Sequence, residues 1–187
     1  VAAAVASRML ILLKQPDLAA ERGRFTEGEG AKAWDRKLVP IVALLLPTVV
    51  LIVCGLDYRW QASGPVAPWL KWTALVLLIA GYAFSLWALI TNRFFSTVVR
   101  IQRDRGHTVV SSGPYRFVRH PGYAGGLLYY VMTPLLLGTL WGFVPVLIEV
   151  ALLVLRTALE DRTLQAELPG YADYARRVRY RLIPGVW

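Results

Sequence analysis

The sequence is poor in the residues that build disulfides and metal centres. It contains one cysteine, Cys54, and two histidines, His107 and His120. A single cysteine can form no disulfide within the chain and no cysteine cluster for a metal. The two histidines stand thirteen residues apart, which is outside the usual zinc-ligand spacings. We therefore expect neither a disulfide-stabilised fold nor a metal cofactor.

Charged residues are also scarce. They make up 18% of the chain, while hydrophobic residues make up 56% and the mean hydropathy is +0.47. A soluble domain is about half apolar and about a quarter charged, so the surplus apolar side chains must face something other than water. The net charge of +9 comes from basic residues that flank apolar segments, which suits an anionic membrane face rather than nucleic acid. We expect an integral membrane protein in contact with lipid.

Long apolar stretches define the expected architecture. Four of them follow a first segment at residues 1–13, which we interpret as the end of a longer helix, and they cover residues 38–56, 72–92, 121–140 and 141–155. A helical crossing of a bilayer needs about 20 apolar residues. An open sheet cannot exist in lipid, because its edges would leave backbone groups without partners. The sequence therefore predicts an all-α, polytopic membrane bundle of about five spans that forms one structural domain.

Positive charge predicts the orientation of these spans. Residues 14–37, residues 93–120 and the tail from Arg156 each carry six basic residues, whereas residues 57–71 carry two and the turn at 138–142 none. Basic loops stay on the cytoplasmic side of a membrane. We expect the N-terminus outside and the C-terminus inside, with the catalytic side facing the cytoplasm, most simply in a bacterial inner membrane.

The stretch HTVVSSGPYRFVRHPGY at residues 107–123 stands just before an apolar helix. Ser111 to Pro114 predict a turn. Pro121 suits the first position of the helix, where its missing N–H costs nothing. His120 stands next to that start, and free backbone N–H groups there could bind an anion. A helix cap with basic anchors for lipid phosphates is the alternative interpretation, and both stay open on these residues.

The last apolar stretch carries ionisable residues at a helical spacing. Glu149, Leu153, Arg156 and Glu160 are four, three and four residues apart, which places them on one face of a helix. Ionisable groups in a membrane usually face the bundle interior or a wet cavity. An ion pair between Arg156 and Glu160 is the structural alternative, and Glu149 would face either the substrate or a neighbouring span. We expect this helix to break at Pro169-Gly170, before a short helix rich in Tyr and Arg.

The two stretches together resemble a known family. HTVVSSGPYRFVRHPGY, a helical hairpin and then ALEDRTLQAELPGYADYARRV are similar to the isoprenylcysteine carboxyl methyltransferase family, which shares features with phospholipid N-methyltransferases. The resemblance covers roughly residues 93–184. It implies that residues 1–92 form N-terminal membrane helices and residues 93–187 the catalytic half. It also implies S-adenosylmethionine as cofactor, bound without a Rossmann domain by the last helices and the C-terminal segment.

The resemblance also implies roles for particular residues. Arg156 matches an arginine near the reacting end of the cofactor, and Glu160 a glutamate beside the cofactor, with Asp161 as the second member of that acidic pair. The implied cofactor-binding residues are His107, Val110, Gly113, Tyr115, Arg119, His120, Tyr123, Tyr171 and Tyr174. Two departures from the family pattern bear on the identity of the methyl acceptor. Glu167 to Gly170 stand where the eukaryotic enzymes have Phe-Gly, and WDRK at 34–37 resembles only bacterial relatives of unassigned substrate.

The sequence thus predicts a membrane methyltransferase that modifies the carboxyl group of an isoprenylcysteine-like or other lipophilic acceptor. A carboxylate is ionised at pH 7 and needs no base, only a cation such as Arg156 to orient it. N-methylation of a phospholipid amine is the alternative and would require a base, for which Glu160, Glu149 or His120 could serve. A non-enzymatic membrane scaffold or sensor remains a further alternative. A transporter is disfavoured, because the charges gather at one membrane face.

Overall fold

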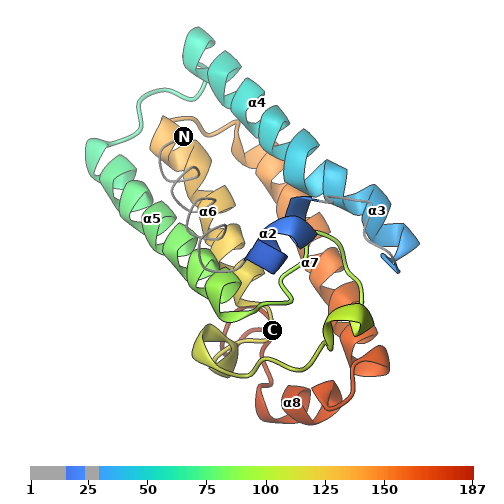
Figure 1. Cartoon of the computed structure of the whole chain (residues 1–187). Coiled ribbons are helices and arrows are strands. Elements are labelled where there is room, and N and C mark those ends of the chain that lie inside the picture. Colours follow the sequence, from blue (N-terminus) through green and yellow to red (C-terminus); the bar gives the residue numbers. More distant parts are fainter. Residues whose placement is uncertain (1–15, 24–29) are drawn as a thin grey trace.

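The computed structural model describes residues 16–23 and 30–187, and within these ranges the chain forms helices and no strand (Figure 1). The expected segment at residues 1–13 lies outside the described residues. The helices are α2 (Pro16–Gly23), α3 (Ala33–Pro40), α4 (Leu46–Trp60), α5 (Pro68–Thr91), α6 (Pro121–Leu137), α7 (Phe143–Glu167) and α8 (Tyr171–Arg177). A π-helical turn, η1 (Ile41–Leu45), and two 3₁₀ turns, η2 (Arg103–Arg105) and η3 (Gly113–Arg116), complete the list.

Helices α3, η1 and α4 run on as one helix from Ala33 to Trp60. This helix and α5 are the two described helices that are long and apolar enough to cross a membrane by themselves. The π-helical turn lies between Pro40 and Pro47. Proline donates no backbone hydrogen bond and disturbs the regular helical ladder, which a local π turn accommodates. The sequence located these two long apolar helices at residues 38–56 and 72–92, but it missed the continuation of the helix at 38–56 back to residue 33.

Helices α5 and α6 pack closely because glycines face each other. A side-chain carbon on Gly81 would lie 2.7 Å from the carbonyl oxygen of Gly125, and one on Gly125 would overlap the carbonyl oxygen of Gly81 and the side chain of Ser85. The Ser85 hydroxyl donates to the carbonyl of Gly122 at 2.8 Å. Small residues that permit close backbone approach are typical of helix interfaces in membranes.

Asp57 joins two loops at the end of the bundle that we predict to lie outside the cytoplasm. It is buried at the end of α4, and its carboxylate accepts the backbone N–H of Ser63 at 2.9 Å and that of Trp141 at 3.2 Å. The Ser63 hydroxyl also donates to Asp57. Because Ser63 follows α4 and Trp141 precedes α7, this single carboxylate holds the two loops together.

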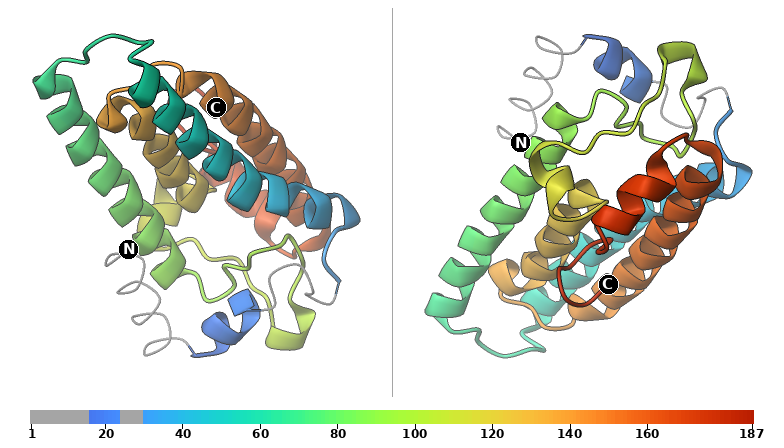
Figure 2. Two further views of the ribbon diagram at one scale, coloured as in Figure 1. Left: turned by 90° about the horizontal axis from the view of Figure 1, so that it is seen from above. Right: turned by 90° about the horizontal axis from the view of Figure 1, so that it is seen from below.

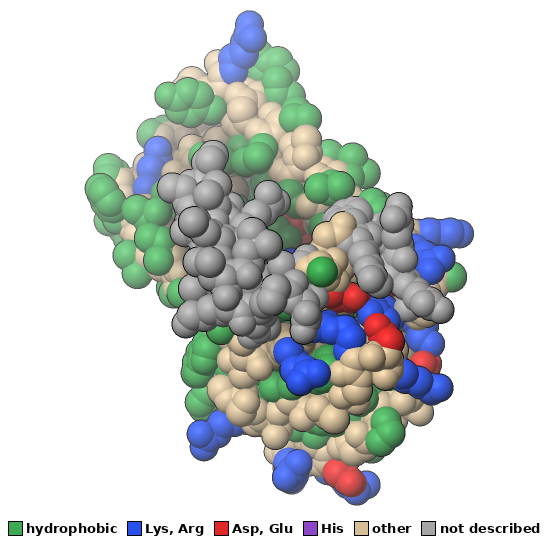
Figure 3. Space-filling model, viewed as in Figure 1, with side chains coloured by type: hydrophobic (Ala, Val, Ile, Leu, Met, Phe, Trp, Pro, Cys, Tyr) green, Lys and Arg blue, Asp and Glu red, His purple; other side chains and the backbone are tan. Residues whose placement is uncertain are grey.

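The opposite end gathers the polar half of the chain. The loop before α6 and the segment after α7 lie together across the ends of α5, α6 and α7 (Figure 2). The backbone N–H groups of Arg119 and His120 donate to the carbonyls of Tyr180 and Arg181, each at 2.9 Å. Charged side chains surround this end, whereas the other end is mostly hydrophobic (Figure 3). The predicted break after α7 is confirmed, since Gly170 takes a left-handed φ of 81° and α8 begins at Tyr171.

Candidate active site

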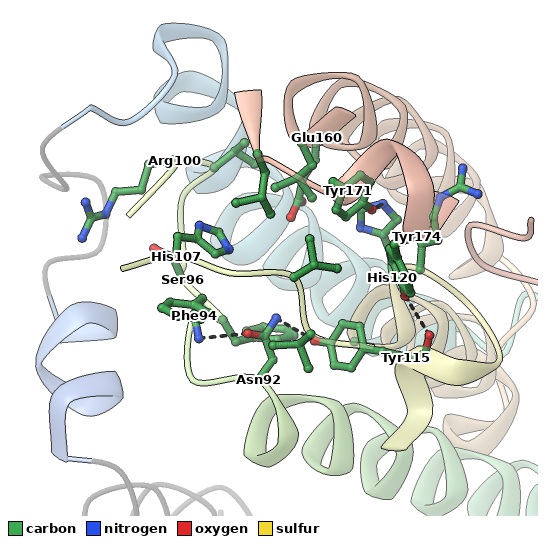
Figure 4. A pocket seen from close by; sticks show the side chains of 18 of the residues that line it. Asn92, Phe94, Ser96, Arg100, His107, Tyr115, His120, Glu160, Tyr171 and Tyr174 are labelled. Carbon is green, nitrogen blue, oxygen red and sulfur yellow. Dashed lines mark hydrogen bonds between the residues drawn. The ribbon is translucent and has the colours of Figure 1, made fainter. Parts of the chain in front are cut away.

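A pocket of about 80 Å³ lies at the polar end, between the loop before α6 and helices α6, α7 and α8. Figure 4 shows side chains from the loop, including His107 and Phe94, on one side and Glu160 with Tyr171 on another. Ten of the eleven residues implied by the family resemblance line it, namely His107, Val110, Tyr115, Arg119, His120, Tyr123, Arg156, Glu160, Tyr171 and Tyr174. The fold therefore brings these residues to one place, while their individual roles stay predictions.

Gly113 is the implied residue that does not line the pocket. Its φ is 56°, a left-handed conformation that favours glycine, and a side-chain carbon there would come within 3.0 Å of the Thr91 hydroxyl. Gly113 begins the 3₁₀ turn η3, which presents Tyr115 to the pocket. Its contribution is thus to the turn rather than to a direct contact with a ligand.

His107 forms part of a flat aromatic wall. Its ring stacks on Phe94 with the ring centroids 4.5 Å apart. Its Nδ1 accepts the backbone N–H of Gln102 at 3.3 Å, which places the ring proton on Nε2. Burial, reinforced by the charges of Arg100 and Arg105, lowers the pKa of His107 to about 4. The ring is therefore neutral at pH 7 and suits contact with a planar, uncharged group.

Three tyrosines hold α8 against the loop. The Tyr174 hydroxyl donates to the carbonyl of Tyr115 at 2.7 Å, and Asn92 donates to the Tyr115 hydroxyl at 3.2 Å. The rings of Tyr171 and Tyr174 meet edge to face at 5.3 Å. Burial raises the pKa of Tyr115, Tyr171 and Tyr174. These hydroxyls stay protonated; those of Tyr171 and Tyr174 donate hydrogen bonds, and that of Tyr115 accepts one.

Asp161 is the buried centre of a polar network below the pocket. Its carboxylate accepts two hydrogen bonds from Arg119, from Nε at 2.7 Å and Nη2 at 2.9 Å, and one from Arg181 at 2.9 Å. The Tyr171 hydroxyl donates to it at 3.2 Å, and His120 Nε2 lies 3.3 Å away. The sequence indicated Asp161 only as the neighbour of Glu160, because the residues that converge on it are distant in the chain.

The anion site at the start of α6 stays a prediction, and some of the groups there have partners within the protein. The backbone N–H groups of Tyr123 and Ala124 both donate to the carbonyl of His120, at 3.1 and 3.0 Å. Arg119 Nη1 donates to the carbonyls of Val178 and Arg179 at 2.8 and 2.7 Å. Arg119 thus helps to hold the C-terminal segment in place as well as lining the pocket, since the backbone of that segment needs hydrogen-bond partners.

Arg156 and Glu160 share a helix face but do not pair with each other in the described part of the chain. Glu160 accepts the Tyr123 hydroxyl at 2.6 Å, and the Arg156 guanidinium lies 5.1 Å from the centre of the Tyr123 ring. Arg156 instead binds Asp35 of α3 through Nε at 2.7 Å and Nη2 at 3.1 Å. The interpretation of an Arg156–Glu160 ion pair is wrong, and Asp35, which lines neither pocket, is the partner of Arg156 that the sequence did not indicate.

A second pocket of about 260 Å³ adjoins the first from the membrane side. It is lined mainly by apolar and small residues, which include Val39, Val42, Ala43, Gly126 and Leu153. Both pockets are lined by Phe95, Ser96, Gly122, Tyr123 and Arg156. Because α3, η1, α6 and α7 all contribute, a ligand here would lie between helices that we place in the membrane. Tyr123 and Arg156 stand where the two pockets meet.

Glu149 lies one turn deeper than Leu153 on the same helix. It is fully buried, and neither of its carboxylate oxygens has a hydrogen-bond partner among the described residues. The expected polar contact with a neighbouring span is therefore not a hydrogen bond within this part of the chain. Three residues before it on α7, Val146 packs with Val50 and Cys54 of α4 in an apolar cluster.

Comparison with known proteins identifies the family. Residues 74–166, about half of the chain, match the model of the isoprenylcysteine carboxyl methyltransferase (ICMT) family. The chain belongs to this family. The ICMT structure of the eukaryotic intramembrane Ras methyltransferase superposes with a TM-score of 0.61 at 20% identity, over 80% of this chain and 60% of that one. At this identity the likeness shows the fold alone, and that fold is one of an integral membrane protein.

Curated ICMT relatives are similar over about half of this chain. Protein-S-isoprenylcysteine O-methyltransferase A of Arabidopsis thaliana is 31% identical over 91 residues, which are 48% of this chain and 42% of the relative. The Mus musculus protein-S-isoprenylcysteine O-methyltransferase is 30% identical over 118 residues, which are 59% of this chain and 40% of the relative. The chain thus spans well under two thirds of these ICMT relatives, and Asp35 lies outside the residues that the family model matches.

Proposed function

We propose that this protein is a membrane methyltransferase that uses S-adenosylmethionine to methylate the carboxyl group of a lipophilic, isoprenylcysteine-like acceptor. The observation that carries the proposal is the meeting of two pockets at Arg156 and Tyr123. One pocket is polar and aromatic, and the other lies among membrane helices. A reaction between a polar methyl donor and a lipid-like acceptor needs this arrangement.

The first pocket fits the proposed cofactor by its chemistry. The neutral ring of His107, stacked on Phe94, offers a flat face for a nucleobase. Glu160 offers a carboxylate for the cationic part of the cofactor. When bound, S-adenosylmethionine supplies an activated methyl group on a sulfonium. The tyrosines of α8 close the pocket and limit the access of water.

The second pocket suits the apolar part of an acceptor. Its walls are helices α5, α6 and α7 and the junction of α3 with η1, with α2 and residues 95–97 at the polar end, so a lipid chain could enter from the bilayer between the helices. Arg156 would orient an acceptor carboxylate, which is already ionised and needs no base. If the acceptor were instead a phospholipid amine, Glu160 is the carboxylate at the junction that could accept a proton.

Gly126 gives a way to test the second pocket separately. A side-chain carbon there would meet only Tyr130, at 3.9 Å, so a larger side chain would extend into the acceptor pocket. We expect Gly126→Leu to raise the acceptor KM by about tenfold or more, corresponding to about 1.4 kcal/mol. The affinity for S-adenosylmethionine, measured by calorimetry, should stay within about twofold of the wild type because Gly126 does not line the first pocket.

The experiment combines this variant with labelled-methyl transfer to N-acetyl-S-farnesylcysteine and to a bacterial lipid extract. Gly55→Leu is the matched control, because Gly55 is exposed on α4 and has no atom within 4 Å of the added carbon. A base-labile label marks a methyl ester, and a base-stable label on a lipid amine marks the phospholipid alternative. Absence of both cofactor binding and methyl transfer would refute the enzymatic proposal and favour a scaffold or sensor.

We also propose five spans, with the polar end and the C-terminus on the cytoplasmic side of a bacterial inner membrane. Basic loops at the polar end support this orientation. Two exposed alanines at opposite ends of the structure, Ala62 and Ala172, allow a direct measurement. In a Cys54→Ser background, an impermeant thiol reagent should label Ala62→Cys in intact cells and Ala172→Cys only after lysis. Labelling of both positions from the same side would contradict the topology.

A further inference from the structure

The partner of Arg156 comes from the N-terminal half of the chain. Asp35 on α3 is fully buried, and its carboxylate accepts three hydrogen bonds. Arg156 donates two of them, at 2.7 and 3.1 Å, and the backbone N–H of Val99 donates the third at 2.6 Å. A two-point contact between a guanidinium and a carboxylate fixes geometry as well as charge. Asp35 therefore determines the plane of the guanidinium at the junction of the two pockets.

The remaining contacts leave one nitrogen of this guanidinium for a ligand. Nη2 also donates to the carbonyl of Thr97 at 2.7 Å, and the Tyr123 ring lies 5.1 Å from the central carbon. Among the described residues, Nη1 has no hydrogen bond. Arg156 lines both pockets, so Nη1 is the group available to orient an acceptor between them.

The change in charge during the proposed reaction points to a second role for Asp35, besides orienting Arg156. A cationic sulfonium and an anionic carboxylate become a neutral thioether and a neutral ester. The acceptor oxygen forms a bond to the methyl carbon as the carbon–sulfur bond breaks, the electron pair stays on sulfur, and no proton moves. The acceptor thus loses negative charge on the way to the transition state. A strong positive field would stabilise the bound carboxylate more than the transition state and would slow the reaction.

We propose that Asp35 is a positioning residue that directs Nη1 of Arg156 toward the acceptor carboxylate and offsets the charge of the guanidinium. The acceptor is then oriented by a hydrogen bond without being held as a tight ion pair, because an adjacent carboxylate cancels much of the field. This inference rests on the carboxyl acceptor of the proposed function. It assigns to the active site a residue of the N-terminal half, outside the region that the family model matches.

Asp35→Asn tests the inference because it removes the charge and keeps the shape. We expect the variant to bind an S-farnesylcysteine carboxylate about tenfold more tightly than the wild type, with a lower KM and a kcat reduced by about tenfold. Binding of the neutral carboxamide analogue should change by less than about twofold. A purely structural role would instead raise the KM and weaken both ligands alike.

Asp57→Asn is the matched control. Asp57 is another buried carboxylate of the same N-terminal half, but it holds loops at the other end of the bundle. This control should lower the melting temperature and leave KM and kcat unchanged. If Asp35→Asn does not fold, the wild type still provides a test through its own ligands. The carboxylate and its carboxamide should bind within about tenfold of each other, because Asp35 offsets the charge that would distinguish them.

The outcomes separate this inference from the proposed function. A wild type that methylates the prenylcysteine, together with a raised KM in Asp35→Asn, would overturn the inference alone. A preference above about a hundredfold for the carboxylate over the carboxamide in the wild type would also overturn it. Cofactor binding without binding or methylation of any prenylcysteine carboxylate would overturn the carboxyl acceptor and this inference with it.

Discussion

Arg156→Lys is expected to lower turnover by about a hundredfold while the affinity for S-adenosylmethionine stays within about twofold of the wild type. Lysine keeps the positive charge but loses the planar fork that binds Asp35 at two points and points a third nitrogen at the acceptor. Loss of one group that orients or stabilises the reacting centre commonly costs about a hundredfold or more in kcat. The contacts that we propose between the cofactor and the loop and α8 are untouched, so binding should persist.

Glu160→Gln provides the contrast to Arg156→Lys. Glutamine can still accept the Tyr123 hydroxyl but carries no charge for the cationic end of the cofactor. We expect it to reduce both cofactor affinity and turnover. The measurement is a methyl-transfer assay beside calorimetry on both folded variants. Full turnover by Arg156→Lys with every tested acceptor would refute the proposal that Arg156 orients the acceptor. Arg156 would then be only a structural partner of Asp35.

Asp161→Asn is expected to destabilise the polar end by about 3–5 kcal/mol and to abolish cofactor binding. Removal of one partner from a buried ion pair leaves the other charges uncompensated. Here the stranded groups are the guanidinium of Arg119, which is buried, and that of Arg181. Because Arg119 also holds two carbonyls of the C-terminal segment, the damage should spread to α8.

The measurement for Asp161→Asn is limited proteolysis of the segment after α7 together with a melting curve. Asp173→Asn is the control, because Asp173 pairs with Arg176 on an exposed surface of α8. Surface pairs of this kind contribute little to stability, so the control should match the wild type in both measurements. Retention of cofactor binding by Asp161→Asn would show that the network is not what shapes the first pocket.

The helical spacing drew attention to Glu149 but did not explain its role. Its spacing correctly placed it on the buried face of α7, because a periodic pattern reports the side of a helix. The pattern carried no information on partners, and the described residues provide no hydrogen bond for it. Burial of a carboxyl group without a hydrogen-bond partner destabilises the folded state. The effect of Glu149 on stability therefore depends on the groups around it and not on its spacing in the sequence.

The sequence by itself determined the two long apolar helices, the break at Gly170 and, through the family resemblance, ten of the residues that line the first pocket. These features depend on local properties: runs of apolar residues, turn chemistry and a motif carried by two short stretches. The position of Pro121 at the first turn of α6 is such a case.

Only the tertiary structure decided which polar group meets which. Asp35 and Arg156 are 121 residues apart, and Asp161 and Arg119 are 42 apart, so no spacing rule connects them. A buried charge must find a partner wherever the fold places one, and that choice depends on how α3, the loop and α7 pack together. For this reason Arg119 and His120 hold the C-terminal segment as well as lining the first pocket, while Asp35, to which the sequence assigned no role, binds Arg156.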